Sequence, residues 1–290
     1  MRITLSAQQK GASLAMLSAL FYSLISVCVK WIGGRLPTVE IVFFRALVML
    51  LLGTGSMAIH RQRPGKTHRT LLIFRGLSGA IGAFTYYAAL AMIPLAETMA
   101  LVNLSPFVVS ILAWLFLREK IYKSHLLALL VSFTGALCII RPSFGEISAG
   151  SLVALASAVA TGCSYTMVRK LKEDVDTPTI VFYYNVVSVA VTFPIMLLQG
   201  FVAPSGMEWV KLLCLGLAAL LFNSFNTSAY RYASAGKISL YNYLSIIFSS
   251  VFGILIWKEY LLATTVLGIA LIFAGAYLSM REGRGESAPV

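Results

Sequence analysis

The sequence predicts an all-α integral membrane protein with ten transmembrane helices, arranged as two inverted five-helix repeats. Its composition, its apolar runs and an internal repeat predict this fold. Hydrophobic residues make up 59% of the 290 residues and charged residues only 12%, about half the charged fraction of a soluble domain. Lipid must therefore be the solvent for much of the surface.

The apolar runs set the number of spans. A bilayer core is crossed by about 20 apolar residues of helix. Connections as short as residues 92–94 require antiparallel neighbours. The ten predicted spans are 11–30, 38–59, 71–92, 95–117, 124–140, 151–168, 177–198, 209–230, 238–257 and 260–280.

An internal repeat relates the two halves of the chain. Residues 94–120 recur as residues 234–260, which places Leu104 on Leu244 at an offset of 140. Earlier in each half, the tripeptide Ile-Val-Phe at 41–43 recurs at 180–182, at an offset of 139. A repeat of this length indicates two copies of one unit.

We place the two units at residues 10–141 and 149–281. Because each has an odd number of spans, the second enters the membrane upside down. Inverted repeats of this kind are typical of secondary transporters, which bind their substrate near the midplane and expose it to each side alternately.

Charge predicts orientation and excludes nucleic acid as a partner. The net charge is +12, but the basic residues form short clusters between apolar runs. Sixteen Lys and Arg residues fall on the side that carries both termini and five on the other. The positive-inside rule therefore predicts cytoplasmic termini.

The turns and span ends carry a family resemblance. Pro-Leu-Ala-Glu (94–97) and Ser-Ala-Gly-Lys (234–237), with Arg-Glu (118–119) and Lys-Glu (258–259), resemble the two EamA repeats of the drug/metabolite transporter (DMT) superfamily. The resemblance covers residues 10–281 and implies a ten-helix exporter of metabolites, often amino acids, in a bacterial inner membrane. Within the family the chain resembles YddG-type exporters of aromatic and neutral amino acids. The second half departs from the pattern, with Ile246 where the first has Pro106.

Polar residues at mid-span are the candidate substrate-binding residues, because such groups are costly in lipid and tend to be functional. Amides, hydroxyls and rings would suit an amphipathic zwitterion. The alternative is hydrogen bonding between helices without a ligand. The candidates are Tyr22, Ser26, Tyr86, Asn103, Tyr165, Asn223, Asn226, Asn242 and Tyr243.

Pro106 and the charged residues inside spans complete the site predictions. Pro106 should bend span four, either as a gating hinge or as a static kink. We expect Arg45 to snorkel to the interface or to pair with Glu40, and Arg75 and Glu97 to be interfacial.

Other function classes find less support. No acidic residue lies at the centre of a span, which disfavours proton coupling and favours facilitated transport. An integral-membrane enzyme is the alternative from another class, but no His-Glu-x-x-His motif or intramembrane aspartyl pair occurs, and the four cysteines have no metal-ligand spacing. No catalytic residue, metal or cofactor is expected. Export of cationic drugs, nucleotides or phosphorylated metabolites stays open. The expected partners are a small-molecule substrate and the bilayer, and one chain would suffice as a monomer.

Overall fold

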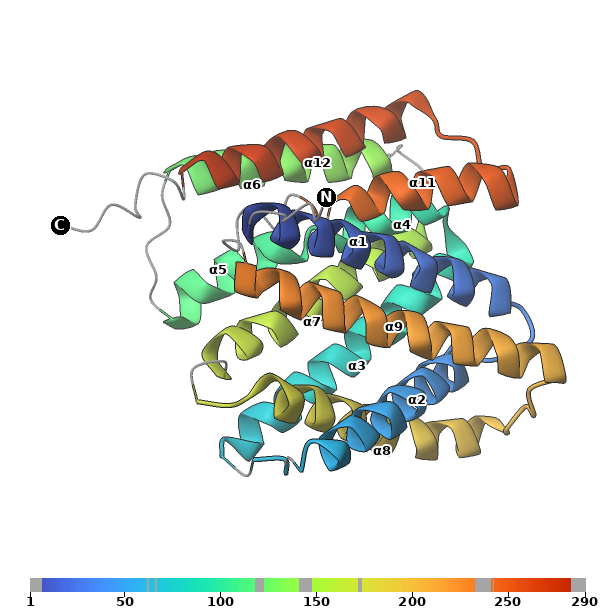
Figure 1. The fold of residues 1–290 in the computed structure, drawn as a ribbon. Helices are drawn as coiled ribbons and strands as arrows, with labels where there is room; N and C mark the ends of the chain where they lie inside the picture. Colours follow the sequence, from blue (N-terminus) through green and yellow to red (C-terminus); the bar gives the residue numbers. More distant parts are fainter. Residues whose placement is uncertain are drawn as a thin grey trace, which may run out of the picture.

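The computed structural model describes residues 7–61, 63–65, 67–117, 123–140, 148–171, 174–232, 241 and 243–282. Eleven helices in these residues lie side by side as one bundle (Figure 1). They are α1 (Ala7–Ile32), α2 (Thr38–Ile59), α3 (Arg69–Met92), α4 (Leu95–Val102), α5 (Ser105–Leu117), α6 (Lys123–Ile140), α7 (Ala149–Leu171), α8 (Thr177–Gln199), α9 (Gly206–Tyr232), α11 (Leu244–Trp257) and α12 (Ala263–Glu282).

These helices supply the predicted spans. Within the described residues, α1, α2, α3, α7, α8 and α9 are each long and apolar enough to cross a membrane, and shorter apolar helices account for the other four spans. Large apolar side chains stand exposed, with Leu198 at 88% and Leu255 at 72%. Lipid is the solvent in which such exposure is stable, so the all-α membrane fold is confirmed.

The bundle has two distinguishable ends. α1 begins and α12 ends at the same end, on the left in Figure 1, which we call the terminal end. The connections 33–37, 200–205 and 258–262 lie at the opposite, far end. Each helix of the first half therefore runs opposite to its counterpart in the second.

Packing between the halves follows a pseudo-two-fold axis. α1 packs on α9 and its counterpart α7 packs on α3, while α2 packs on α8 and α6 on α12. A Cβ atom on Gly135 of α6 would stand 2.6 Å from the carbonyl oxygen of Gly268 of α12. Small residues allow this direct approach of two backbones in lipid.

Span four is broken in its middle. α4 ends at Val102 and α5 begins at Ser105, so Asn103 and Leu104 are outside both helices. Pro106 is the second residue of α5, where a missing backbone N–H removes no intrahelical bond. In the second half α11 also begins at the equivalent point, Leu244, although that half lacks the proline. A helix therefore begins at this point in both halves, and a hinge role for Pro106 stays a prediction.

Candidate functional site

A cavity of about 90 Å³ lies midway along the helices, between α1, α2, α3, α7, α8 and α9. We call it the mid-bundle cavity. Both halves line it. Its larger polar side chains are Tyr22, Arg45, Arg75, Tyr86, Tyr87, Tyr165, Tyr184 and Asn223.

Two buried arginines meet at one tyrosine ring. Arg45 and Arg75 are each only 8% exposed. The Arg75 guanidinium carbon lies 4.2 Å from the centroid of the Tyr184 ring, and that of Arg45 lies 5.4 Å from it. Arg45 also donates a hydrogen bond to the Tyr184 hydroxyl. The ring's negative face attracts both cations and partly offsets their transfer out of water.

Gly79 makes room for one of these guanidiniums. A Cβ atom on Gly79 would stand 2.8 Å from a terminal nitrogen of Arg75 and 2.8 Å from the Tyr184 ring. Gly79 lies one turn after Arg75 on α3, so the arginine side chain folds over its own helix towards the cavity. This path explains how a residue near the start of the span reaches the cavity.

The expectations for both arginines were wrong. Arg75 is buried rather than interfacial, and Arg45 contacts Tyr184 rather than Glu40. Glu40 instead accepts a hydrogen bond from the backbone N–H of Val202, at 2.8 Å. The repeat in the sequence could have indicated the contact between Arg45 and Tyr184, because these two residues are equivalent at the offset of 139.

Aromatic rings form the wall of the cavity on the α1 side. Tyr22 stacks on Phe222, with centroids 4.8 Å apart and planes at 19°. It also packs against Tyr86, at 5.7 Å. The Tyr86 hydroxyl lies 2.5 Å from the Ser26 hydroxyl, which is fully buried behind it. Tyr22, Tyr86, Tyr165 and Asn223 are thus the predicted residues that the structure brings together around the cavity.

The other predicted residues lie elsewhere. The Asn103 side chain donates to the carbonyl of Met99 at 2.7 Å, and the Tyr243 hydroxyl donates to the carbonyl of Asn103 at 3.3 Å. These contacts support the break in span four and do not face the cavity. Asn226 has a buried side-chain oxygen without a hydrogen-bond partner, away from the cavity lining. Asn242 lies outside the described residues.

A second cavity of about 420 Å³, the terminal-side cavity, lies between α2, α8 and α9. It is lined from Thr177, the first residue of α8, to Asn185 and Asn223 deeper in the bundle. Asn223 also lines the mid-bundle cavity, so this residue lies between the two cavities.

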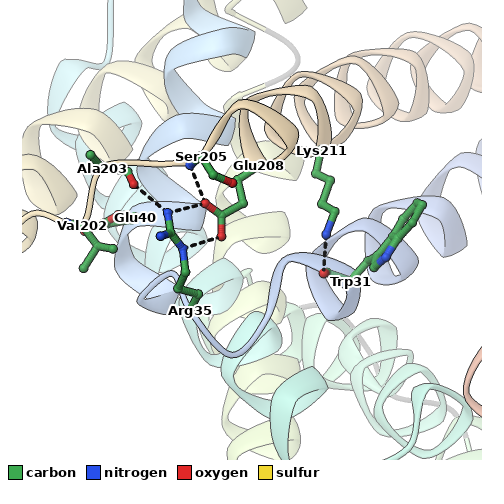
Figure 2. Close-up of polar contacts among 8 residues, drawn as sticks. All are labelled: Trp31, Arg35, Glu40, Val202, Ala203, Ser205, Glu208 and Lys211. Atoms are coloured by element: carbon green, nitrogen blue, oxygen red, sulfur yellow. Dashed lines mark hydrogen bonds and ion pairs between the residues drawn. The ribbon is translucent and has the colours of Figure 1, made fainter.

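Polar contacts connect the two halves of the chain at the far end (Figure 2). Arg35 donates to both carboxylate oxygens of Glu208, at 2.8 and 2.6 Å, and to the carbonyl of Ala203, at 2.8 Å. The Glu208 carboxylate raises the pKa of Arg35 above its usual value. Lys211 donates to the carbonyl of Trp31 at 3.2 Å. These contacts join the α1–α2 connection to the start of α9.

A second ion pair lies on the same side. Lys30, in the last turn of α1, pairs with Glu259, which follows α11. Glu259 also accepts a hydrogen bond from the backbone N–H of Leu95, at 3.0 Å, at the start of α4. One carboxylate therefore holds three elements from both halves together. We call this pair and the Arg35–Glu208 pair the far-end contacts.

The inverted repeats and the polar cavity between them define a membrane transporter. Residues 9–141 and 148–281 both match the model of the EamA-like transporter family. The chain belongs to this family, within the DMT superfamily, and is not an enzyme.

Curated relatives match along almost the whole chain. The pseudopaline exporter CntI of Pseudomonas aeruginosa is 34% identical over 284 residues, which cover 96% of this chain and 98% of that protein. The riboflavin transporter of Brucella anthropi is 28% identical, covering 92% and 96%. These relatives support a transporter of small metabolites, and the likeness to YddG-type amino-acid exporters stays a prediction.

A solved crystal structure is among those with the same fold. It superposes with a TM-score of 0.69, covering 96% of this chain and 99% of the other, at 18% sequence identity. At this identity the likeness shows the fold alone.

Proposed function

We propose that the chain exports amino acids or related small carboxylates by alternating access. The observation that carries the proposal is the mid-bundle cavity, in which two guanidinium groups and several tyrosines face one space between the repeats. Guanidinium groups bind carboxylates through parallel hydrogen bonds. The rings beside them would pack the apolar part of the same molecule.

The charge distribution and the position of the cavities support export as the direction of transport. The terminal-side cavity shares Asn223 with the mid-bundle cavity, while the far-end contacts join the halves on the other side. The positive-inside rule assigns the terminal end to the cytoplasm. The substrate would enter from the cytoplasm, and breaking the far-end contacts would release it outside.

Phosphorylated metabolites are the second candidate. The sequence analysis ranked them lower because only Arg45 was expected at depth, but Arg75 adds a second buried cation. Two buried cations repel a third, so the same observation disfavours export of cationic drugs.

Flux from proteoliposomes tests the proposal. Purified protein would be reconstituted with labelled amino acids, dicarboxylates, phosphorylated sugars and organic cations, together with pseudopaline and riboflavin because of the two relatives. We expect saturable efflux of at least one carboxylate and none of the cations. Efflux of cations alone, or of no compound at all, would contradict the proposal.

A further inference from the structure

The mid-bundle cavity holds two buried positive charges that lack a counter-ion among the described residues. The described ion pairs involve neither Arg45 nor Arg75. The cavity lining contains no Asp or Glu. A charged group inside a membrane is costly and normally pairs with an opposite charge, so this charge excess needs a separate explanation.

The hydrogen-bond donors of the pair are also incompletely used. The Nε atoms of Arg45 and Arg75 are both buried without a hydrogen-bond partner in the described structure. A guanidinium presents five donors in a rigid fork. The hydroxyl and the ring of Tyr184, together with the Tyr87 ring 5.8 Å from the Arg45 guanidinium carbon, satisfy only part of this set. A buried donor without an acceptor is unfavourable, and a bound anion would supply the missing acceptors.

We infer that Arg45 and Arg75 form one binding site for a doubly charged anion, so that the exported molecule carries two carboxylates or a phosphate monoester. The inference rests on the proposed function and adds the charge of the substrate. Carboxylate and phosphate share the chemistry required here, since both accept two parallel hydrogen bonds from one guanidinium.

The charge balance separates a dianion from a neutral amino acid. A zwitterion would bring one carboxylate to the pair, together with an ammonium group that the second guanidinium repels. No carboxylate lines the cavity to receive that ammonium. A dianion instead neutralises both arginines at once, and its apolar part would lie against Tyr22 and Phe222.

Matched probes in proteoliposomes test the inference. The dianions are glutarate and glycerol 3-phosphate, which distinguish carboxylate from phosphate, and the neutral zwitterion is leucine. The variants are Arg45→Gln and Arg75→Gln, with Arg69→Gln as control, because Arg69 lies exposed at the start of α3. We expect the wild type to carry a dianion faster than leucine. Each cavity variant should lose at least tenfold of dianion flux and a smaller share of any leucine flux, because leucine brings only one carboxylate to the pair, and Arg69→Gln should match the wild type.

The outcomes separate this inference from the proposed function. A wild type that carries leucine but neither dianion overturns the inference and leaves the proposed function standing, as does an equal loss of leucine and dianion flux in the variants. A wild type that carries none of the probes or other carboxylates overturns both. Should the glutamine variants fail to reach the membrane, the wild-type ratio of dianion to leucine flux decides alone, and a ratio below one overturns the inference.

Discussion

Arg45 and Tyr184 occupy equivalent positions in the two halves of the chain, and Arg45 donates a hydrogen bond to the Tyr184 hydroxyl across a separation of 139 residues. Asn103 and Tyr243, separated by 140 residues, make a second contact of this kind. Both pairs therefore lie at the pseudo-two-fold axis. Because one partner is a cation and the other a ring, the site is chemically asymmetric although the fold is not.

Tyr184 should contribute through both its ring and its hydroxyl. Tyr184→Phe keeps the ring under both guanidiniums but removes the acceptor for Arg45. The loss of a hydrogen bond to a charged group costs about 1.5 kcal/mol, so we expect roughly tenfold weaker apparent affinity with little change in maximal flux. Tyr184→Leu also removes the ring and should weaken transport further. The KM of efflux measures both changes, and equal values for the wild type and Tyr184→Phe would contradict this role.

Gly79 should be required for the position of Arg75. In Gly79→Ala the new Cβ would displace the Arg75 guanidinium or the Tyr184 ring, since both lie 2.8 Å from it. We expect flux to fall several-fold while membrane insertion stays normal. The matched control is Gly55→Ala on α2, where a Cβ meets nothing within 4 Å and alanine favours the helix by about 1 kcal/mol. Full transport activity in Gly79→Ala would show that the Arg75 guanidinium can move without loss of flux.

The spans and the repeat could be predicted because their signals lie in the sequence itself. The length of each apolar run indicates the length of the span, and the repeat relates each residue to its counterpart in the other half. A bend in span four was expected from Pro106, and the structure has a break there, but α11 begins at the equivalent Leu244 without a proline. The start of a helix at this point therefore does not require a proline.

The cavity lining could be predicted only in part, because burial depends on where a side chain points. Tyr22 and Tyr86 were found because large polar groups at mid-span are rare. Arg75 was missed because its Cα lies near a span end, whereas its guanidinium reaches inward past Gly79. Asn103 was favoured for its depth, yet its amide binds the carbonyl one turn earlier on α4.

The far-end contacts should differ in strength. Arg35 has a 54% exposed side chain, and an exposed ion pair is worth about 0–1 kcal/mol. In the other pair Lys30 is only 20% exposed, and its partner Glu259 also binds the N–H of Leu95. We therefore expect the far end to open several-fold more often in Glu259→Gln. In Glu208→Gln the frequency of opening should change less than twofold.

Access of a thiol reagent from the far end measures this opening. The probe is a cysteine at Ala83, which lines the mid-bundle cavity, in a background without the native cysteines. Its rate of modification should rise in Glu259→Gln and, in the otherwise unchanged protein, with added salt, which screens ion pairs. A rate in Glu259→Gln that equals the rate in the otherwise unchanged protein would mean that this pair does not hold the far end closed.

The orientation of the bundle gives the last prediction. The sequence predicts sixteen Lys and Arg residues on the side of the termini against five on the other side, which predicts that the terminal end faces the cytoplasm. Tyr260, 89% exposed in the far-end connection 258–262, and Arg63, exposed between α2 and α3, are suitable positions for single cysteines. In intact cells a membrane-impermeant maleimide should label Tyr260→Cys and leave Arg63→Cys unlabelled until the membrane is permeabilised. The reverse labelling pattern would mean that the terminal end faces outward. The terminal-side cavity would then admit substrate from outside, and the proposed direction of export would be wrong.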